Sequence, residues 1–250
     1  MSAVPPGGVR AEAVSAAYRR RQEPVLRDVT LRAPPGHVTA VVGPNGAGKT
    51  TLFRVLMGFL PPRSGVVTIA GYRPERFRRR NGIALLPERT PVPAGWTFRA
   101  LVEEGCDLHG LRGDGRRRAR RRAWERSDLD ERQRRTPLAR LSKGQARRAV
   151  LAFALIGEPH LVLLDEPLSG LDPAGRARLR AVLSDLAASG STVVMTSHEL
   201  GEVARLADRA VVLRGGRTVE TLEDPGDAAA LERAVLDAGA VPRRAGPEGR

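Results

Sequence analysis

A glycine-rich loop at residues 43–50 is the first part of this sequence that could do chemistry. It fits the pattern of a glycine, four residues and then Gly-Lys-Thr. Glycines let backbone N–H groups surround phosphate oxygens, and a following helix turns its positive end toward the same anion. Lys49 can neutralise β- and γ-phosphate charge, and the Thr50 hydroxyl can bind Mg²⁺, which prefers hard oxygen ligands. We therefore expect phosphate binding by Gly43, Pro44, Asn45, Gly46, Ala47, Gly48, Lys49, Thr50 and Thr51.

Two adjacent carboxylates, Asp165 and Glu166, follow the apolar run 161–164. Carboxylates at the end of a buried strand are costly unless a cation or water compensates them. A metal site accounts for both: we expect Asp165 to hold Mg²⁺, directly or through water, and Glu166 to polarise the water that attacks the γ-phosphate. The alternative is an ordinary acidic pair before a helix that begins near Pro167, and the phosphate loop makes that alternative weaker.

Strands and helices alternate along the chain around these two motifs. Apolar runs bounded by Pro and Gly predict strands at 25–31, 37–42, 66–71, 82–87, 161–165, 192–197, 210–214 and 218–220. Helical spacing of apolar residues predicts helices at 50–60, 98–111, 145–156, 173–189, 198–207 and 228–239. Strands that alternate with helices indicate an α/β fold around a mainly parallel sheet that is buried on both faces.

The stretch at about 88–154 has helical patterns and many charges but no predicted strand, so we expect a helical subdomain there. We expect residues 1–225 to form one domain, with its core at about 1–87 and 155–225, and residues 226–250 to form a C-terminal helix and a frayed tail. Within the helical stretch, residues 112–122 contain seven arginines. In a helix these would point all round the axis, so we expect this segment to be exposed.

Composition excludes several classes of protein. Apolar residues make up 41% of the chain, enough for a core, which excludes a disordered chain, and aromatic residues make up only 4%, so the core must be aliphatic. Cys106 is the only cysteine and cannot form an intramolecular disulfide. The N-terminus has no apolar stretch of the kind a secretory signal needs, and the longest apolar run, 149–157, is about half of the roughly 20 residues that span a membrane. We expect a cytoplasmic protein whose membrane role would need a partner.

The net charge of +14 would ordinarily favour binding to nucleic acid or an anionic membrane. The basic residues are nearly all arginine, however, since Lys49 and Lys143 are the only lysines. A genome-wide codon bias explains this skew better than one basic surface does, because Ala and Gly are abundant too. Lipid binding by residues 112–122 and codon bias both remain open, and the two surviving lysines each fall inside a motif.

Residues 141–145, Leu-Ser-Lys-Gly-Gln, lie before the acidic strand and resemble the signature motif of ABC (ATP-binding cassette) ATPases. In the order typical of that family, Tyr18 resembles the aromatic residue that stacks on adenine, Asp172 belongs to a sequence similar to the D-loop, and His198 resembles the switch histidine that senses the γ-phosphate. The resemblance extends to about residue 222. It implies a phosphate-loop NTPase (RecA-like) core, an N-terminal antiparallel β subdomain and a helical signature subdomain.

The resemblance also implies a homodimer whose subunits pair head to tail, with two ATP molecules and their Mg²⁺ ions between them, each at the phosphate loop of one subunit and the signature of the other. Ser142, Gly144 and Gln145 would then meet the γ-phosphate of the partner's nucleotide, with a helix dipole behind them. Glu166 and His198 would be the catalytic residues. Tyr18 and Asp172 would complete the nucleotide site.

Glu88 departs from the common family pattern, which has glutamine at this position. Some family members that resemble drug and antibiotic exporters with a separate membrane subunit of the ABC-2 type also have Leu-Pro-Glu here. By resemblance this position approaches Mg²⁺, so the expected metal residues are Thr50, Glu88 and Asp165, and three carboxylates, with Glu166, would crowd one cation. Glu88 and the absence of a long C-terminal regulatory domain favour an exporter.

The function that we expect is ATP hydrolysis that drives a separately encoded, multispanning membrane subunit from the inner face of the cell membrane. The alternative is a soluble or membrane-associated ABC ATPase that acts on nucleic acid, the ribosome or cell-wall enzymes. Nucleic acid is the weaker expectation, because translation factors of this superfamily usually carry two cassettes in one chain and DNA-repair members carry long insertions. The transported cargo depends on the membrane subunit, which forms the path.

Overall fold

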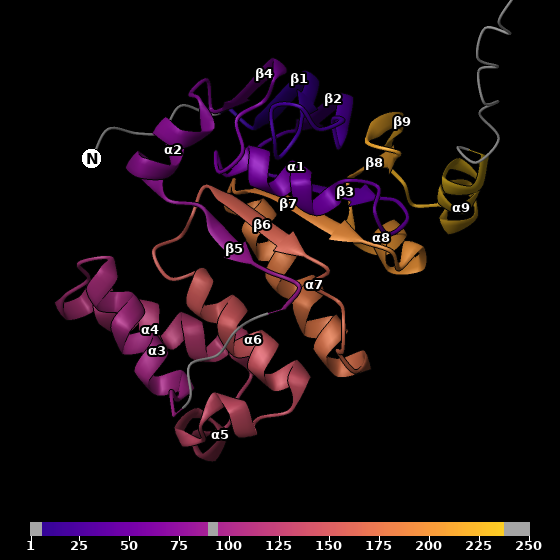
Figure 1. Cartoon of the computed structure of the whole chain (residues 1–250). Coiled ribbons are helices and arrows are strands. Elements are labelled where there is room, and N and C mark those ends of the chain that lie inside the picture. Colours follow the sequence, from indigo (N-terminus) through magenta and orange to yellow (C-terminus); the bar gives the residue numbers. More distant parts are fainter. Residues whose placement is uncertain (1–6, 90–94, 238–250) are drawn as a thin grey trace, which may run out of the picture.

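The computed structural model describes residues 7–89 and 95–237, and a six-stranded sheet lies at the centre of this part of the chain (Figure 1). The strand order is β5-β6-β7-β3-β8-β9, and each neighbouring pair is parallel except β8 and β9. The predicted α/β fold with a mainly parallel sheet is therefore confirmed. The strands are β3 (Val38–Val42), β5 (Ala84–Leu86), β6 (Leu161–Asp165), β7 (Thr192–Ser197), β8 (Arg209–Arg214) and β9 (Arg217–Glu223).

The central sheet is buried on both faces because β3, β6 and β7 are buried at every position rather than at alternate ones. In β6, Leu161 and Leu163 pack into one hydrophobic cluster, and Val162 and Leu164 pack into another on the opposite face. The first cluster includes residues of α1 (Lys49–Leu56), and the second includes residues of α7 (Pro173–Ala188), α8 (Leu200–Leu206) and α9 (Ala228–Asp237). Helix–sheet–helix layering fixes the strand ends that carry the acidic residues.

A second, antiparallel sheet covers the α1 side of the molecule. Its strand order is β2-β1-β4, and it shares the hydrophobic cluster of α1. The short helix α2 (Pro74–Asn81) follows β4 and buries Pro74 and Phe77. The expected N-terminal antiparallel β subdomain is thus present, with β1 (Val9–Ala16), β2 (Leu26–Ala33) and β4 (Ser64–Ile69) as its strands.

A group of helices lies apart from the sheets (Figure 1) and has its own hydrophobic cluster, which includes Phe98, Val102 and Cys106. These elements are α3 (Phe98–Leu108), α4 (Gly113–Ser127), α5 (Glu131–Arg135), a single turn of 3₁₀ helix (Leu138–Arg140) and α6 (Lys143–Ala154). They fall within the predicted helical subdomain, whose boundaries at 88 and 154 stay a prediction.

The arginine run 112–122 was expected to be exposed on all sides, and the structure shows that it is not. It lies mostly in α4, and Arg116 packs toward α3, where its guanidinium binds Glu103 at 2.6 Å and Asp107 at 2.7 Å. Only 27% of the Arg116 side chain is exposed. The two hydrogen bonds raise the pKa of the Arg116 guanidinium, and the bond from Arg116 lowers the pKa of the Asp107 carboxyl. The expectation failed because α3 presents acids to one side of α4.

Within the described residues, no helix has the length and apolar character that crossing a membrane requires. The helix predicted at 228–239 corresponds to α9, which ends at Asp237. The rest of the expected C-terminal tail, 238–250, lies outside the described residues.

Candidate functional site

The glycine-rich loop and the acidic strand end meet in one pocket of about 460 Å³. The pocket lies where β3, β6 and β7 end side by side, because neighbouring parallel strands present their carboxyl ends at the same edge of a sheet. Its lining residues are Val25, Asn45, Gly46, Ala47, Gly48, Lys49, Thr50, Thr51, Glu88, Asp165, Glu166, Ser169 and His198.

Two glycines of the loop have backbone conformations that L side chains rarely adopt. Gly43 has φ 154°, and a Cβ atom there would lie 2.0 Å from the carbonyl oxygen of Leu213. Gly48 has φ 106° and directly precedes α1. Only glycine fits these positions, so the loop can wrap closely before the helix begins.

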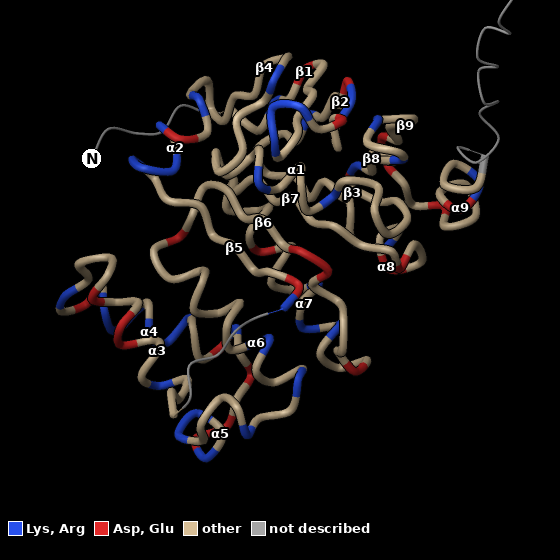
Figure 2. Tube along the Cα trace, in the orientation of Figure 1, with Lys and Arg blue, Asp and Glu red and all other residues tan. Residues whose placement is uncertain are grey.

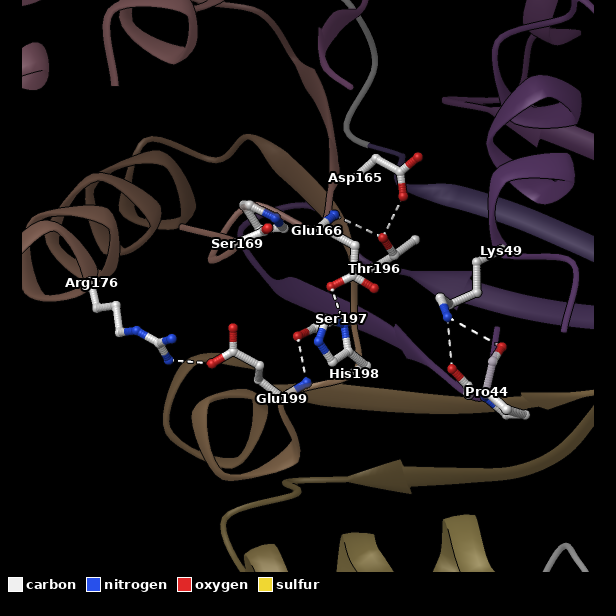
Figure 3. A network of polar contacts seen from close by, with 12 residues as sticks. Pro44, Lys49, Asp165, Glu166, Ser169, Arg176, Thr196, Ser197, His198 and Glu199 are labelled. Carbon is white, nitrogen blue, oxygen red and sulfur yellow. Dashed lines mark hydrogen bonds and ion pairs between the residues drawn. The ribbon is translucent and has the colours of Figure 1, made fainter. Parts of the chain in front are cut away.

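Lys49 is buried at the first position of α1, with 8% of its surface exposed. Its ammonium donates hydrogen bonds to the carbonyl oxygens of Gly43 at 2.7 Å and Pro44 at 3.4 Å (Figure 3). Lys49 therefore closes the loop on itself. Its positive charge lies in the pocket together with the N-terminus of α1, which makes this end of the pocket suited to an anion.

Asp165 and Glu166 face the same pocket from the end of β6, and both are buried. Thr196 lies opposite Asp165 on β7 and donates its hydroxyl to Asp165 Oδ1 at 2.6 Å, while the backbone N–H of Glu166 donates to Thr196 Oγ1 at 3.0 Å. Thr196 thus fixes both acidic residues. Sequence reasoning missed Thr196, although its place at the end of a predicted strand beside His198 was a usable signal.

Glu166 and His198 are brought together from adjacent strand ends. His198 Nδ1 lies 2.9 Å from Glu166 Oε2 (Figure 3). Glu166 also has φ 49°, in the left-handed region that a non-glycine residue enters at a cost. The strained backbone, the buried carboxylate and the histidine together hold one carboxylate oxygen in a fixed place at the pocket wall.

Arg147 of α6 is a second residue that sequence reasoning missed. It is 5% exposed, and its guanidinium donates to the backbone carbonyls of Pro167 (3.0 Å), Asp165 (2.7 Å), Glu166 (2.6 Å) and Glu88 (2.8 Å). Burial lowers the pKa of this guanidinium, whereas the carboxylates of Asp165, Glu166 and Glu88 oppose the shift. The residue joins the helical group to the acidic strand end.

The predicted signature residues lie at the start of α6 and do not line the pocket. Ser142 caps the helix: its hydroxyl accepts from the N–H of Gln145, and the Gln145 side chain accepts from the N–H of Ser142. A Cβ atom added at Gly144 would lie 3.2 Å from the carbonyl oxygen of Gly170. Lys143 donates to the hydroxyl of Ser169, a pocket residue, at 3.3 Å. One chain therefore carries its pocket and its signature residues at separate places.

Tyr18 and Asp172 lie near the pocket without lining it. The Tyr18 hydroxyl is 3.0 Å from the hydroxyl of Thr51, a lining residue, and 44% of Tyr18 is exposed. Asp172 caps α7, since its carboxylate accepts from the N–H of Gly175 at 2.7 Å. Val25, which sequence reasoning missed, is the apolar residue from the N-terminal sheet side that does line the pocket.

Thr50, Glu88 and Asp165 all line the pocket, as the metal prediction requires. In the part of the chain that the structure describes, however, no three His, Cys, Asp or Glu side chains are grouped so that they could hold a metal ion. The expected crowding of Glu88, Asp165 and Glu166 around one cation in the closed dimer stays a prediction. A hydroxyl and a carboxylate do fit Mg²⁺ that arrives with a nucleotide, because this ion keeps water and phosphate oxygens as its other ligands.

Comparisons with known proteins agree with this geometry. The family model described as "ABC transporter" matches residues 26–169. The chain is 40% identical to daunorubicin resistance ATP-binding protein DrrA3 of Streptomyces coeruleorubidus over 82% of this chain and 65% of that protein. It is 35% identical to cobalt import ATP-binding protein CbiO of Rhodobacter capsulatus over 94% of this chain and 80% of CbiO. The chain thus spans less than two thirds of the DrrA3 length.

A solved structure of the ATP-binding subunit of an ABC transporter has the same fold. Its TM-score is 0.77 at 28% identity, and the match covers 92% of this chain and 96% of that one. Family model, relatives and fold agree with the motif order and with the phosphate-loop pocket. The chain belongs to the ATP-binding proteins of the ABC transporter family.

Proposed function

We propose that this protein binds Mg²⁺-ATP at the phosphate-loop pocket and hydrolyses it to drive a transporter. The observation that carries the proposal is that Lys49, Thr50, Asp165, Glu166 and His198 come from three distant segments and line one pocket. A structural role for the loop alone would not need a buried acid pair and a histidine beside it.

Each residue has a distinct part in the proposed reaction. Lys49 and the N-terminus of α1 bind the β- and γ-phosphates, and Glu166 accepts a proton from the water that attacks the γ-phosphate. His198 holds the Glu166 carboxylate and reaches toward the γ-phosphate from its exposed side, since 62% of its side chain is exposed. Bound Mg²⁺, held by Thr50 and Asp165 with Glu88 nearby, would neutralise phosphate charge.

The active form that we propose is a head-to-tail homodimer. The separation of signature and pocket within one chain supports it, because Ser142, Gly144 and Gln145 can serve a nucleotide only if they meet the pocket of another copy. The N-terminus of α6 would then contribute its dipole and the Ser142 hydroxyl to the partner's γ-phosphate. Tyr18 would stack on adenine, and Asp172 would hold the loop between β6 and α7.

The finer proposal is that the transporter is an exporter. Its separately encoded, multispanning membrane subunit would bind this protein at the inner face of the cell membrane. Glu88 supports export. The names of the relatives do not agree on the direction of transport, because one names drug resistance and the other names cobalt import. Action on nucleic acid is the weaker candidate because nothing in the pocket selects for it.

Two measurements test the proposal. Purified protein should hydrolyse ATP in the presence of Mg²⁺, and Lys49→Ala should abolish tight ATP binding; turnover without Mg²⁺ or in Lys49→Ala would contradict the pocket assignment. For direction, cells that express the protein with the membrane subunit from a neighbouring gene should accumulate less of a fluorescent amphipathic dye than cells with the Lys49→Ala variant. ATP-dependent gain of a solute would favour import instead.

A further inference from the structure

Positive charge is concentrated in the N-terminal part of the molecule. Residues 7–89 contain fifteen Lys and Arg against five Asp and Glu, whereas residues 161–237 contain eight against thirteen. In Figure 2, blue segments mark α2 and the loop between β1 and β2, and red segments are frequent around α8 and α9. The N-terminal segment is therefore net basic, whereas residues 161–237 are net acidic.

The arginines of α2 differ from those of α4 in their partners. Arg117, Arg121 and Arg122 of α4 each pair with an acid, namely Asp114, Glu125 and Glu158 respectively. Among the residues that the structure describes, the following arginines on and beside α2 form no ion pair: Arg73, Arg76, Arg78, Arg79 and Arg80. Apart from the one acid of α2, Glu75, which forms no ion pair with them in the described part of the chain, these arginines are not offset locally, while the charge of α4 is largely neutralised within the chain.

Aromatic rings hold several of these arginines in place. The guanidinium of Arg76 lies 5.2 Å from the centre of the Tyr72 ring, and that of Arg80 lies 5.8 Å from it. Arg78 lies 4.7 Å from the ring of Phe59 and donates to the Met57 carbonyl at 3.0 Å. Stacked guanidiniums keep their donors free for an anion and lose less freedom when they bind it.

The same surface also exposes apolar area. Phe59 is 60% exposed, and Pro61, two residues later in the sequence, is exposed too. Helix α2 buries Phe77 on its inner side, so Arg76, Arg79 and Arg80 face outward. Basic groups beside an exposed aromatic ring match the boundary between lipid headgroups and hydrocarbon, where aromatic residues gather.

We propose that this surface, formed by the five arginines of residues 73–80 with Tyr72 and Phe59, binds the anionic phospholipid headgroups of the membrane. The inference rests on the proposed function, which places the protein beside a membrane subunit. A lipid surface fits better than nucleic acid, because an eight-residue helix is about 12 Å long and reaches few phosphates of a polymer, whereas mobile headgroups can gather under each arginine.

The test uses the full-length protein and sedimentation with vesicles at low ionic strength. One set of vesicles is pure phosphatidylcholine, and the other contains about 30% phosphatidylglycerol, an anionic content of the kind that attracts basic segments. The α2 variant changes Arg73, Arg76, Arg79 and Arg80 to Gln. The matched α4 variant removes the same charge by changing Arg117, Arg118, Arg121 and Arg122 to Gln.

We expect the parent protein to bind anionic vesicles and not neutral ones. The α2 variant should bind roughly 100-fold more weakly, and salt near 0.5 M should weaken the parent comparably, whereas the α4 variant should stay within about threefold of the parent. A double variant, Arg76→Gln with Arg79→Gln, should show an intermediate loss and guards against misfolding of the fourfold variant.

Three results would overturn the inference. They are no binding of the parent to anionic vesicles, equal losses in the α2 and α4 variants, and tighter binding of a single-stranded oligonucleotide than of vesicles at equal phosphate concentration. ATP hydrolysis is measured on the same samples and should not change in the α2 variant. Absence of hydrolysis in the parent would contradict the proposed function, while the vesicle data would still decide the lipid surface.

Discussion

Glu166 is held at three points in the pocket wall. Its backbone N–H is bonded to Thr196, its carbonyl to Arg147, and its carboxylate to His198. A carboxylate fixed in this way can accept a proton from a water molecule at one defined place, which is what a general base must do.

We predict that Glu166→Gln keeps ATP binding but slows hydrolysis by roughly 10²- to 10⁴-fold, the usual contribution of a positioned base. Equilibrium binding and single-turnover hydrolysis measure the two effects separately. Glu199→Gln is the control, because Glu199 pairs with Arg176 and does not line the pocket. If Glu166→Gln turned over like the parent, Glu166 would not be the base.

Glu88 contributes one exposed carboxylate to the pocket that Asp165 and Glu166 also line. Glu88→Gln should leave ATP affinity unchanged, since the phosphate loop is intact. It should raise the Mg²⁺ concentration for half-maximal hydrolysis by at most about fivefold, because a single exposed charge contributes about 1 kcal/mol or less. Mg²⁺ titration of ATPase activity measures this, and superimposable curves would remove Glu88 from the metal site.

Helix α6 connects the two functional parts of the chain. Lys143 reaches Ser169 and Arg147, one helical turn later, reaches the carbonyls of residues 165–167 and of Glu88. Both side chains leave the same face of α6, because residues four apart lie one above the other. Any shift of α6 therefore moves the loop that carries Glu166.

Arg147→Lys should lower kcat by roughly 10- to 100-fold with little change in KM, because a lysine cannot reproduce a planar fork of donors and small displacements of reacting groups are costly. Arg148→Lys is the matched control, because it makes the same charge-preserving substitution at the next residue of α6. Arg148 donates to the Ser127 carbonyl inside the helical group. Thermal melts of both variants distinguish a loss of folding stability from a displacement of the loop that carries Glu166. Equal kcat values in the two variants would show that Arg147 only stabilises the fold.

The sequence permits prediction of elements whose signal is local. Residues 43–50 hold the whole phosphate loop in one stretch, and β3, β6 and β7 each contain an apolar run, so loop and sheet could be predicted. Thr196 and Arg147 act through contacts with residues 18 to 59 positions away, which no spacing rule encodes. The burial of Arg116 against α3 was unpredictable for the same reason.

The molecule as a whole holds the residues of the proposed composite site in two groups. Its pocket holds the phosphate loop, the acids and His198, and its signature residues cap α6 elsewhere, with their polar groups paired to each other. If the arginine surface at α2 binds the membrane, the pocket and the signature residues are both left free to meet a second copy.

ATP-dependent dimerisation of the Glu166→Gln protein tests the central claim most directly, because this variant should bind ATP without consuming it. Light scattering in saturating Mg²⁺-ATP should give the mass of a dimer, whereas ADP should leave mainly the 26.9 kDa monomer. Addition of Ser142→Arg to the Glu166→Gln protein would block the signature end of α6, so this double variant should remain monomeric in ATP. A Glu166→Gln protein that stayed monomeric in saturating ATP, or dimerised equally in ADP, would contradict the composite site.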